Sequence, residues 1–192
     1  MATYYDADTC VFWDVVDFPV PEDRMLDSFR SKVERALRME GYIGKLEIQA
    51  YGGADADRMD FLCAKMQLVQ NAAEKHVRLS RMQLDILYWA FRCYHDELEH
   101  NETNFLVVAK DIPGKDTGFL NLLETLTSRG YNVFLVVPDD VPLEQVPRTD
   151  TVALVWRWTN LFDGGFPILD YLGPDTSSDE EDCDEEDSEK LV

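Results

Sequence analysis

The chain has 192 residues, of which 45% are apolar, and its 38 acidic and 18 basic residues give a formal net charge of −20 at pH 7. No apolar run approaches the roughly 18 residues of a membrane-spanning helix, and the opening MATYYDADTC has neither the basic nor the apolar region of a signal peptide. The chain also lacks the overall basic charge of a non-specific nucleic-acid binder, and its four cysteines form no C-x-x-C pair, so we expect no zinc site and reduced thiols in a cytoplasmic or nuclear protein.

The first part of the chain alternates between strand and helix patterns. Residues 10–16 are rich in β-forming and aromatic side chains and predict a buried strand. Residues 21–40 have apolar side chains at helical spacing, and Gly41 after them is a typical helix end. A second strand is expected over residues 45–51 and a second helix over residues 54–73.

The rest of the chain continues this alternation. Continuous apolar runs such as NFLVVAKD are typical of strands that are buried on both faces of a parallel sheet. The whole pattern predicts a three-layer α/β/α fold with a mostly parallel central sheet. The segment 74–81 is ambiguous and is taken as a short strand. The remaining expected helices are 82–94, 117–128 and a short one after Pro142, and the remaining strands are 104–111, 131–137 and 151–158.

Aspartates stand where a parallel α/β protein places its ligands, beyond the carboxyl ends of the strands. Asp14 and Asp17 close the first strand, and Asp111 ends NFLVVAKD, with Asp116 five residues later. Asp85 lies inside the apolar string MQLDILYWAF, where a carboxylate is costly without a partner. Converging carboxylates repel one another unless cations bind, and Mg²⁺ or Mn²⁺ suits oxygen ligands.

From the residues alone, other interpretations of these acids remain open. Acids at strand ends also cap helices, and among 38 acidic residues some coincidence is expected. A phosphoryl-accepting, receiver-like domain also combines acids at strand ends with a lysine. That domain explains Asp85 poorly, because Asp85 belongs to a helix pattern.

Basic residues near the acids are candidate contacts for a substrate phosphate. Arg78 and Arg81 precede Asp85, and Arg81 is one helical turn from it. Lys110 and Lys115 belong to the segment that carries the last acids. The alternative is a set of basic side chains on a solvated surface, and Lys110 could instead point into the acids and replace the charge of a metal ion.

Several motifs resemble NYN domains of the PIN-like nuclease superfamily, and the limkain or meiosis-regulator type in particular. VFWDVVDFPVP (residues 11–21) is similar to the opening motif of these domains, and LDILYWA (84–90) to their middle motif. NFLVVAKDIPGKDTGFLNLLETLTSRGYNVFLVVPD resembles the last motif, and VWRWTNLFDGG the closing segment. The resemblance implies a PIN-like fold and a Mg²⁺- or Mn²⁺-dependent ribonuclease that acts on single-stranded RNA, often as a homodimer.

The resemblance also implies roles for individual residues. The implied catalytic residues are Asp14, Asp85 and Asp111. The implied metal ligands are these three together with Asp17 and Asp116, and the implied substrate contacts are Arg81, Lys110 and Lys115.

Three departures from the family pattern leave a second hypothesis open. The small Ser-Gly pair before the first acid of the last motif is Ala109-Lys110 here, and the two acids of that motif are five residues apart instead of two. Val16 stands in place of a usual Glu. The second hypothesis is therefore a catalytically degenerate NYN-like interaction module in RNA regulation.

Residues 175–192 form an acidic tail. They carry ten Asp or Glu and one Lys, a net charge of −9, which leaves −11 on the rest of the chain. Such a segment cannot bury apolar surface, so we expect one domain over residues 1–174 followed by a disordered tail. The tail either only increases solubility or binds basic protein partners, and Ser177 and Ser178 suit an acid-directed kinase.

Overall fold

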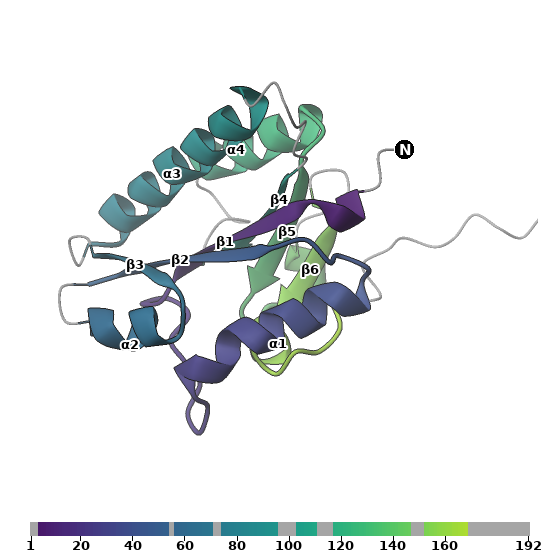
Figure 1. The fold of residues 1–192 in the computed structure, drawn as a ribbon. Helices are drawn as coiled ribbons and strands as arrows, with labels where there is room; N and C mark the ends of the chain where they lie inside the picture. Colours follow the sequence, from purple (N-terminus) through teal and green to yellow (C-terminus); the bar gives the residue numbers. More distant parts are fainter. Residues whose placement is uncertain are drawn as a thin grey trace, which may run out of the picture.

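A computed structural model describes residues 4–53, 56–70, 74–95, 103–110, 117–146 and 152–168. Its centre is a six-stranded parallel sheet with the strand order β3-β2-β1-β4-β5-β6 (Figure 1). This order places β1 and β4, which are not consecutive in the chain, side by side at the centre. The strands are β1 (Asp8–Asp14), β2 (Leu46–Gly52), β3 (Gln67–Gln70), β4 (Thr103–Val108), β5 (Asn132–Val137) and β6 (Leu154–Arg157).

Helices cover both faces of the sheet. Helices α1, α2 and α5 pack on one face, and α3 and α4 pack on the other (Figure 1). This arrangement confirms the predicted three-layer α/β/α fold. No helix in the described ranges is long and apolar enough to cross a membrane. The helices are α1 (Leu26–Met39), α2 (Arg58–Cys63), α3 (Lys75–His95), α4 (Thr117–Ser128) and α5 (Trp158–Phe162), with single 3₁₀ turns at Tyr4–Asp6 and Leu143–Gln145.

An aromatic cluster fills the core between the sheet and α1. Trp13 of β1 is fully buried, and its ring centroid lies 4.5 Å from that of Phe29 and 5.4 Å from that of Trp158. Its indole Nε1 donates a hydrogen bond to the Phe18 carbonyl oxygen at 2.8 Å. The neighbouring Phe12 points to the opposite face, into the core beneath α3 and α4, because successive strand residues alternate between faces. The end of β1 is therefore held from both sides.

The expected helix over residues 54–73 is wrong in its extent. The chain instead forms the short α2, which Asp57 caps by accepting from the Met59 N–H at 2.8 Å, and then the edge strand β3. Lys65 has a left-handed φ of 57°, which ends the helix and turns the chain toward β2. Pairing with β2 outweighs the helical pattern of this segment.

The segment 74–81 is also corrected. It forms the start of α3 and not a short strand. The expected strand over residues 10–16 begins two residues earlier and ends at Asp14. Most of the remaining expected elements are confirmed in type, and residues 117–128 form a helix with the expected bounds. The expected acidic tail lies outside the described residues.

We predict that Trp13→Ala lowers the free energy of unfolding by about 3–5 kcal/mol, because it leaves a large cavity and removes a buried indole hydrogen bond. Urea denaturation of the full chain measures this change. Leu62→Ala is the control, because Leu62 is 64% exposed on α2 and should cost less than about 1 kcal/mol. Equal losses in the two variants would contradict the described core.

Candidate functional site

The candidate site lies at the carboxyl edge of the sheet, between its two central strands. The chain leaves β1 and β4 in opposite directions, to β2 and to β5, which makes this edge the topological switch point of the fold. Trp13 pairs with Val108, so Asp14 and Ala109 follow next to each other at the ends of these strands. Parallel α/β proteins bind their ligands in this position.

Asp14 is a fully buried carboxylate that a buried arginine neutralises. The Nε of Arg78 lies 3.1 Å from both carboxylate oxygens of Asp14, and the two residues are 0% and 1% exposed. Asp14 Oδ1 also accepts the backbone N–H groups of Val16 at 3.0 Å and Asp17 at 3.3 Å. These contacts turn the chain at the end of β1 and satisfy the carboxylate inside the protein.

Asp17 lies beside this pair and contacts two further basic groups. The Lys75 ammonium is 2.8 Å from Asp17 Oδ2, and the Arg78 Nη2 is 3.8 Å from Asp17 Oδ1. Arg78 therefore lies between the two carboxylates and contacts both. Asp14 and Asp17, which the sequence predicts to belong to one site, are brought together by this guanidinium.

Asp85 has its own partners. Its Oδ2 lies 3.0 Å from Arg81 Nε and accepts a hydrogen bond from the Tyr51 hydroxyl at 3.0 Å. Burial raises the pKa of Tyr51, and the nearby Asp85 raises it further, so the hydroxyl stays protonated and donates. Tyr51 pairs with Asp14 in the register of β1 and β2, so it connects Asp85 to the same edge of the sheet.

The basic partners all come from the first turns of α3. Lys75, Arg78 and Arg81 follow one another at three-residue spacing, so they lie along one side of the helix, and Asp85 follows at four residues. From the sequence, Arg78 is expected among the substrate contacts, and no role is expected for Lys75. The K-x-x-R-x-x-R-x-x-x-D spacing of a helix puts these residues on the side that carries Asp85, but it does not show that they contact Asp14 and Asp17.

The other predicted site residues belong to the segment after β4. Lys110 is exposed, and among the described residues the cations that contact Asp14 and Asp17 are Arg78 and Lys75. Asp111, Lys115 and Asp116 lie outside the described residues.

The described residues do not fit a divalent metal ion in this arrangement. In the described ranges, no three His, Cys, Asp or Glu side chains form a group that could hold a metal. Asp14 and Asp17, which the resemblance implies as ligands, contact Arg78 and Lys75 instead. A guanidinium on these oxygens both occupies them and repels a second cation.

Comparison with known proteins identifies one family. The family model of the NYN domain matches residues 8–148, well over half of the chain. The matched range contains β1 to β5 and the whole charged site described above. The match is to the NYN domain in general and does not select the limkain or meiosis-regulator type. No curated protein matches the chain.

We predict strong coupling between Asp14 and Arg78 in a double-mutant cycle. Asp14→Asn and Arg78→Met should each lower the free energy of unfolding by about 3–5 kcal/mol, because each leaves a buried charge without its partner. The double variant should lose less than the sum of the single losses, by roughly 1–3 kcal/mol. Urea denaturation of the four proteins measures the coupling, and additive losses would show that the two side chains are not paired.

Proposed function

This chain belongs to the NYN domain family, a family of nuclease-like domains associated with RNA, and on that premise we propose that it binds RNA with its acidic site balanced by basic side chains of α3. The observation that carries the proposal is the contact of Arg78 with both oxygens of Asp14. In this function the domain holds RNA without cleaving it. This proposal corresponds to the second hypothesis drawn from the sequence, a catalytically degenerate NYN-like interaction module.

The energetics of Asp14 support this proposal. A buried carboxylate needs a counter-charge, and arginine supplies one that stays protonated at every physiological pH. NYN and PIN-like nucleases generally use divalent metals, but a metal ion at Asp14 would have to displace a guanidinium that is itself 1% exposed. Leaving either partner of such a pair unmatched costs several kcal/mol. A guanidinium provides no open coordination position for water, so Arg78 itself would not activate one.

RNA contacts are proposed for the exposed basic residues around the same edge. The Arg81 side chain is 53% exposed beside Asp85, and Lys110 is exposed after β4. Lys115, outside the described residues, is the third proposed contact. Arg81 and Lys110 place local positive charge at this edge of a strongly acidic chain, and phosphate contacts of this kind provide salt-dependent affinity.

A metal-dependent ribonuclease is the second candidate function. One observation favours it: the acids Asp14, Asp85 and Asp111 stand in the order of the family motifs. Asp17 and Asp116 would complete the ligand set for Mg²⁺ or Mn²⁺, and the substrate would be an RNA phosphodiester. This function requires Arg78 to leave Asp14, which the contacts in the described residues oppose.

The acidic tail is proposed to have a separate role. Residues 175–192 carry a net charge of −9, which suits binding of basic protein partners in the cytoplasm or nucleus. The domain over residues 1–174 would then hold RNA while the tail holds a protein.

We predict that the full chain binds a fluorescein-labelled single-stranded RNA equally well in EDTA and in Mn²⁺, and that the RNA stays intact. Fluorescence anisotropy measures the binding, and a denaturing gel checks the RNA. Lys110→Ala should weaken binding and lower the slope of log affinity against log salt by about 1, as expected for one phosphate contact. Arg38→Ala is the control, because Arg38 is an exposed basic residue at the end of α1, on the opposite face of the sheet.

Thermal melting separates the two candidate functions. Mn²⁺ should raise the Tm of the wild-type chain no more than it raises the Tm of Asp14→Asn, and neither rise should be saturable. The variant keeps the same acidic tail, so any effect of Mn²⁺ on the tail is the same in both proteins. Cleavage of the RNA in Mn²⁺ that Asp85→Asn abolishes without lowering the Tm would establish the metal-dependent ribonuclease instead.

A further inference from the structure

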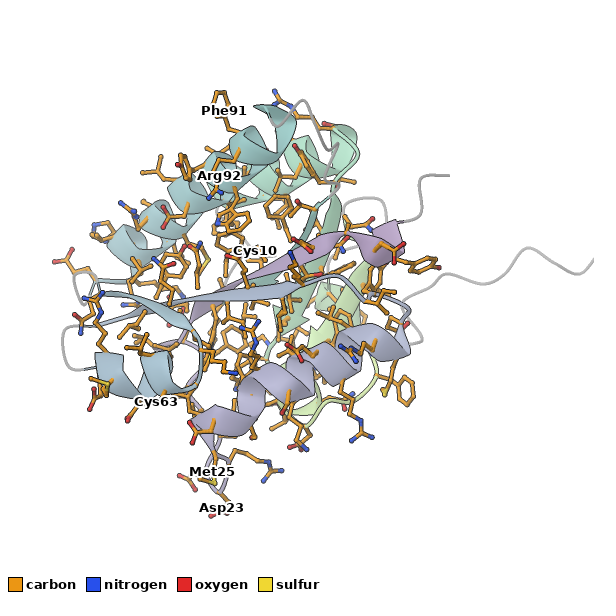
Figure 2. All side chains as sticks on the ribbon, in the orientation of Figure 1. Cys10, Asp23, Met25, Cys63, Phe91 and Arg92 are labelled. Carbon is orange, nitrogen blue, oxygen red and sulfur yellow. The ribbon has the colours of Figure 1, made fainter. Side chains whose placement is uncertain are left out.

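Helix α3 has an outer face that is unusually apolar for a helix exposed to solvent. Leu84, Leu87, Tyr88 and Phe91 are 62%, 48%, 60% and 61% exposed, and they follow at helical spacing along one side. In Figure 2, Phe91 projects from α3 away from the sheet. The outer face of such a helix is normally polar, and a contiguous exposed apolar patch marks a binding surface.

Two guanidinium groups border the same face. Of the four Lys or Arg of α3, Lys75 and Arg78 contact the acids of the site, while Arg81 and Arg92 are exposed, although the whole chain has a net charge of −20. The Arg92 guanidinium lies over the rings of Tyr88, at 5.9 Å, and Trp89, at 5.3 Å. Aromatic rings with adjacent positive charge are therefore exposed on this helix, and the charge favours an anionic ligand.

A groove continues this face toward α4. It has a volume of about 800 Å³ and is lined by Tyr88 and Phe91 of α3 together with Leu122 and Leu126 of α4. Arg129, directly after α4, also lines it. The groove thus combines apolar walls with a basic end.

We propose that this outer face of α3 binds single-stranded RNA, with bases stacking on Tyr88 and Phe91 and phosphates meeting Arg92 and Arg129. The proposal rests on the RNA binding proposed above and extends it to a second set of residues. Single strands bind proteins in this way, because every base has a face that stacks on an aromatic ring while basic side chains hold the backbone. A duplex would keep its bases stacked internally and leave the rings unused.

The positions of the exposed arginines along α3 allow one RNA strand to contact both the acidic site and the aromatic rings. Arg81 contacts the acidic site at one end of the face, and Arg92 lies eleven residues further along. At the helical rise of 1.5 Å per residue this separation is about 16 Å. A strand of a few nucleotides covers this distance, so the same RNA reaches both Arg81 and the aromatic rings.

Charge argues against a second copy of the chain as the occupant. A two-fold contact of this face with itself would place the same patch on both sides. Arg81 and Arg92 of the two copies would then share one interface, and like charges in contact are costly. A polyanion such as RNA is instead attracted by the same arginines.

The test is a comparison of ring and apolar replacements in the full chain. Anisotropy with a labelled twelve-nucleotide oligouridine should show a loss of affinity of roughly fivefold or more for Tyr88→Leu and for Phe91→Leu, because leucine keeps the apolar surface and removes the stacking face. Tyr88→Phe keeps the ring and should retain the affinity. Leu62→Ala, an exposed apolar residue on α2, is the unaffected control.

Each outcome of this test decides the proposal. Unchanged affinity of both leucine variants, with wild-type binding intact, overturns the role of this face and leaves the RNA function proposed for the site. Failure of the wild-type chain to bind any RNA overturns both. Light scattering that shows a dimer in the wild type and a monomer in Tyr88→Leu, with equal RNA affinity, makes the face an interface between copies and also overturns the proposal. Matching Tm values confirm that the variants are folded.

Discussion

The structure depends on one electrostatic requirement, a counter-charge for the carboxylate of Asp14. This side chain is 0% exposed at the end of a central strand, where water cannot solvate it. Arg78 meets the requirement, and it has to come from an element that passes over the end of β1, which fixes where α3 begins. The two backbone N–H groups that Asp14 also accepts turn the chain after β1 and bring Asp17 to the same guanidinium. The local geometry of the site thus follows from satisfying one buried charge.

The nature of that counter-charge determines the chemistry of this edge. A divalent cation on a carboxylate keeps coordination positions for water and a phosphate oxygen, whereas a guanidinium only donates hydrogen bonds and coordinates no water. Arg78 stabilises the site, and its burial leaves it unable to meet a substrate. Arg81 is in a different situation, because half of its side chain remains exposed while it contacts Asp85. In the proposed function, holding the acids and contacting a phosphate would therefore be divided between two arginines one turn apart.

The sequence predicts the parts of this fold that have a strong, unambiguous pattern. The central strands are continuous apolar runs and α4 is a clear amphipathic segment, so their types are predicted correctly. The sequence also places Asp14 and Asp17 in one site, but it cannot show what binds them. An arginine is rarely buried, so nothing in the pattern indicates that Arg78 is. The prediction for residues 54–81 is wrong for a different reason. Strand β3 has only four residues, and its pairing with β2 outweighs the local helical preference. Because β3 is missed, the start of α3 is also assigned incorrectly.

The proposed RNA binding has to be reconciled with the acidic charge of the chain, and helix α3 offers the explanation. With a net charge of −20, the average field of the chain repels RNA, but charges separated by more than about 8 Å are largely screened at physiological ionic strength. Only the nearest groups then determine the attraction, and on the outer side of α3 the basic ones are Arg81, beside Asp85, and Arg92. The inner side of the helix uses its basic groups to balance buried acids, while Arg81 and Arg92 remain exposed. If RNA binds as proposed, most of the surface repels it and this helix attracts it, so the acidic body itself would restrict where the RNA binds.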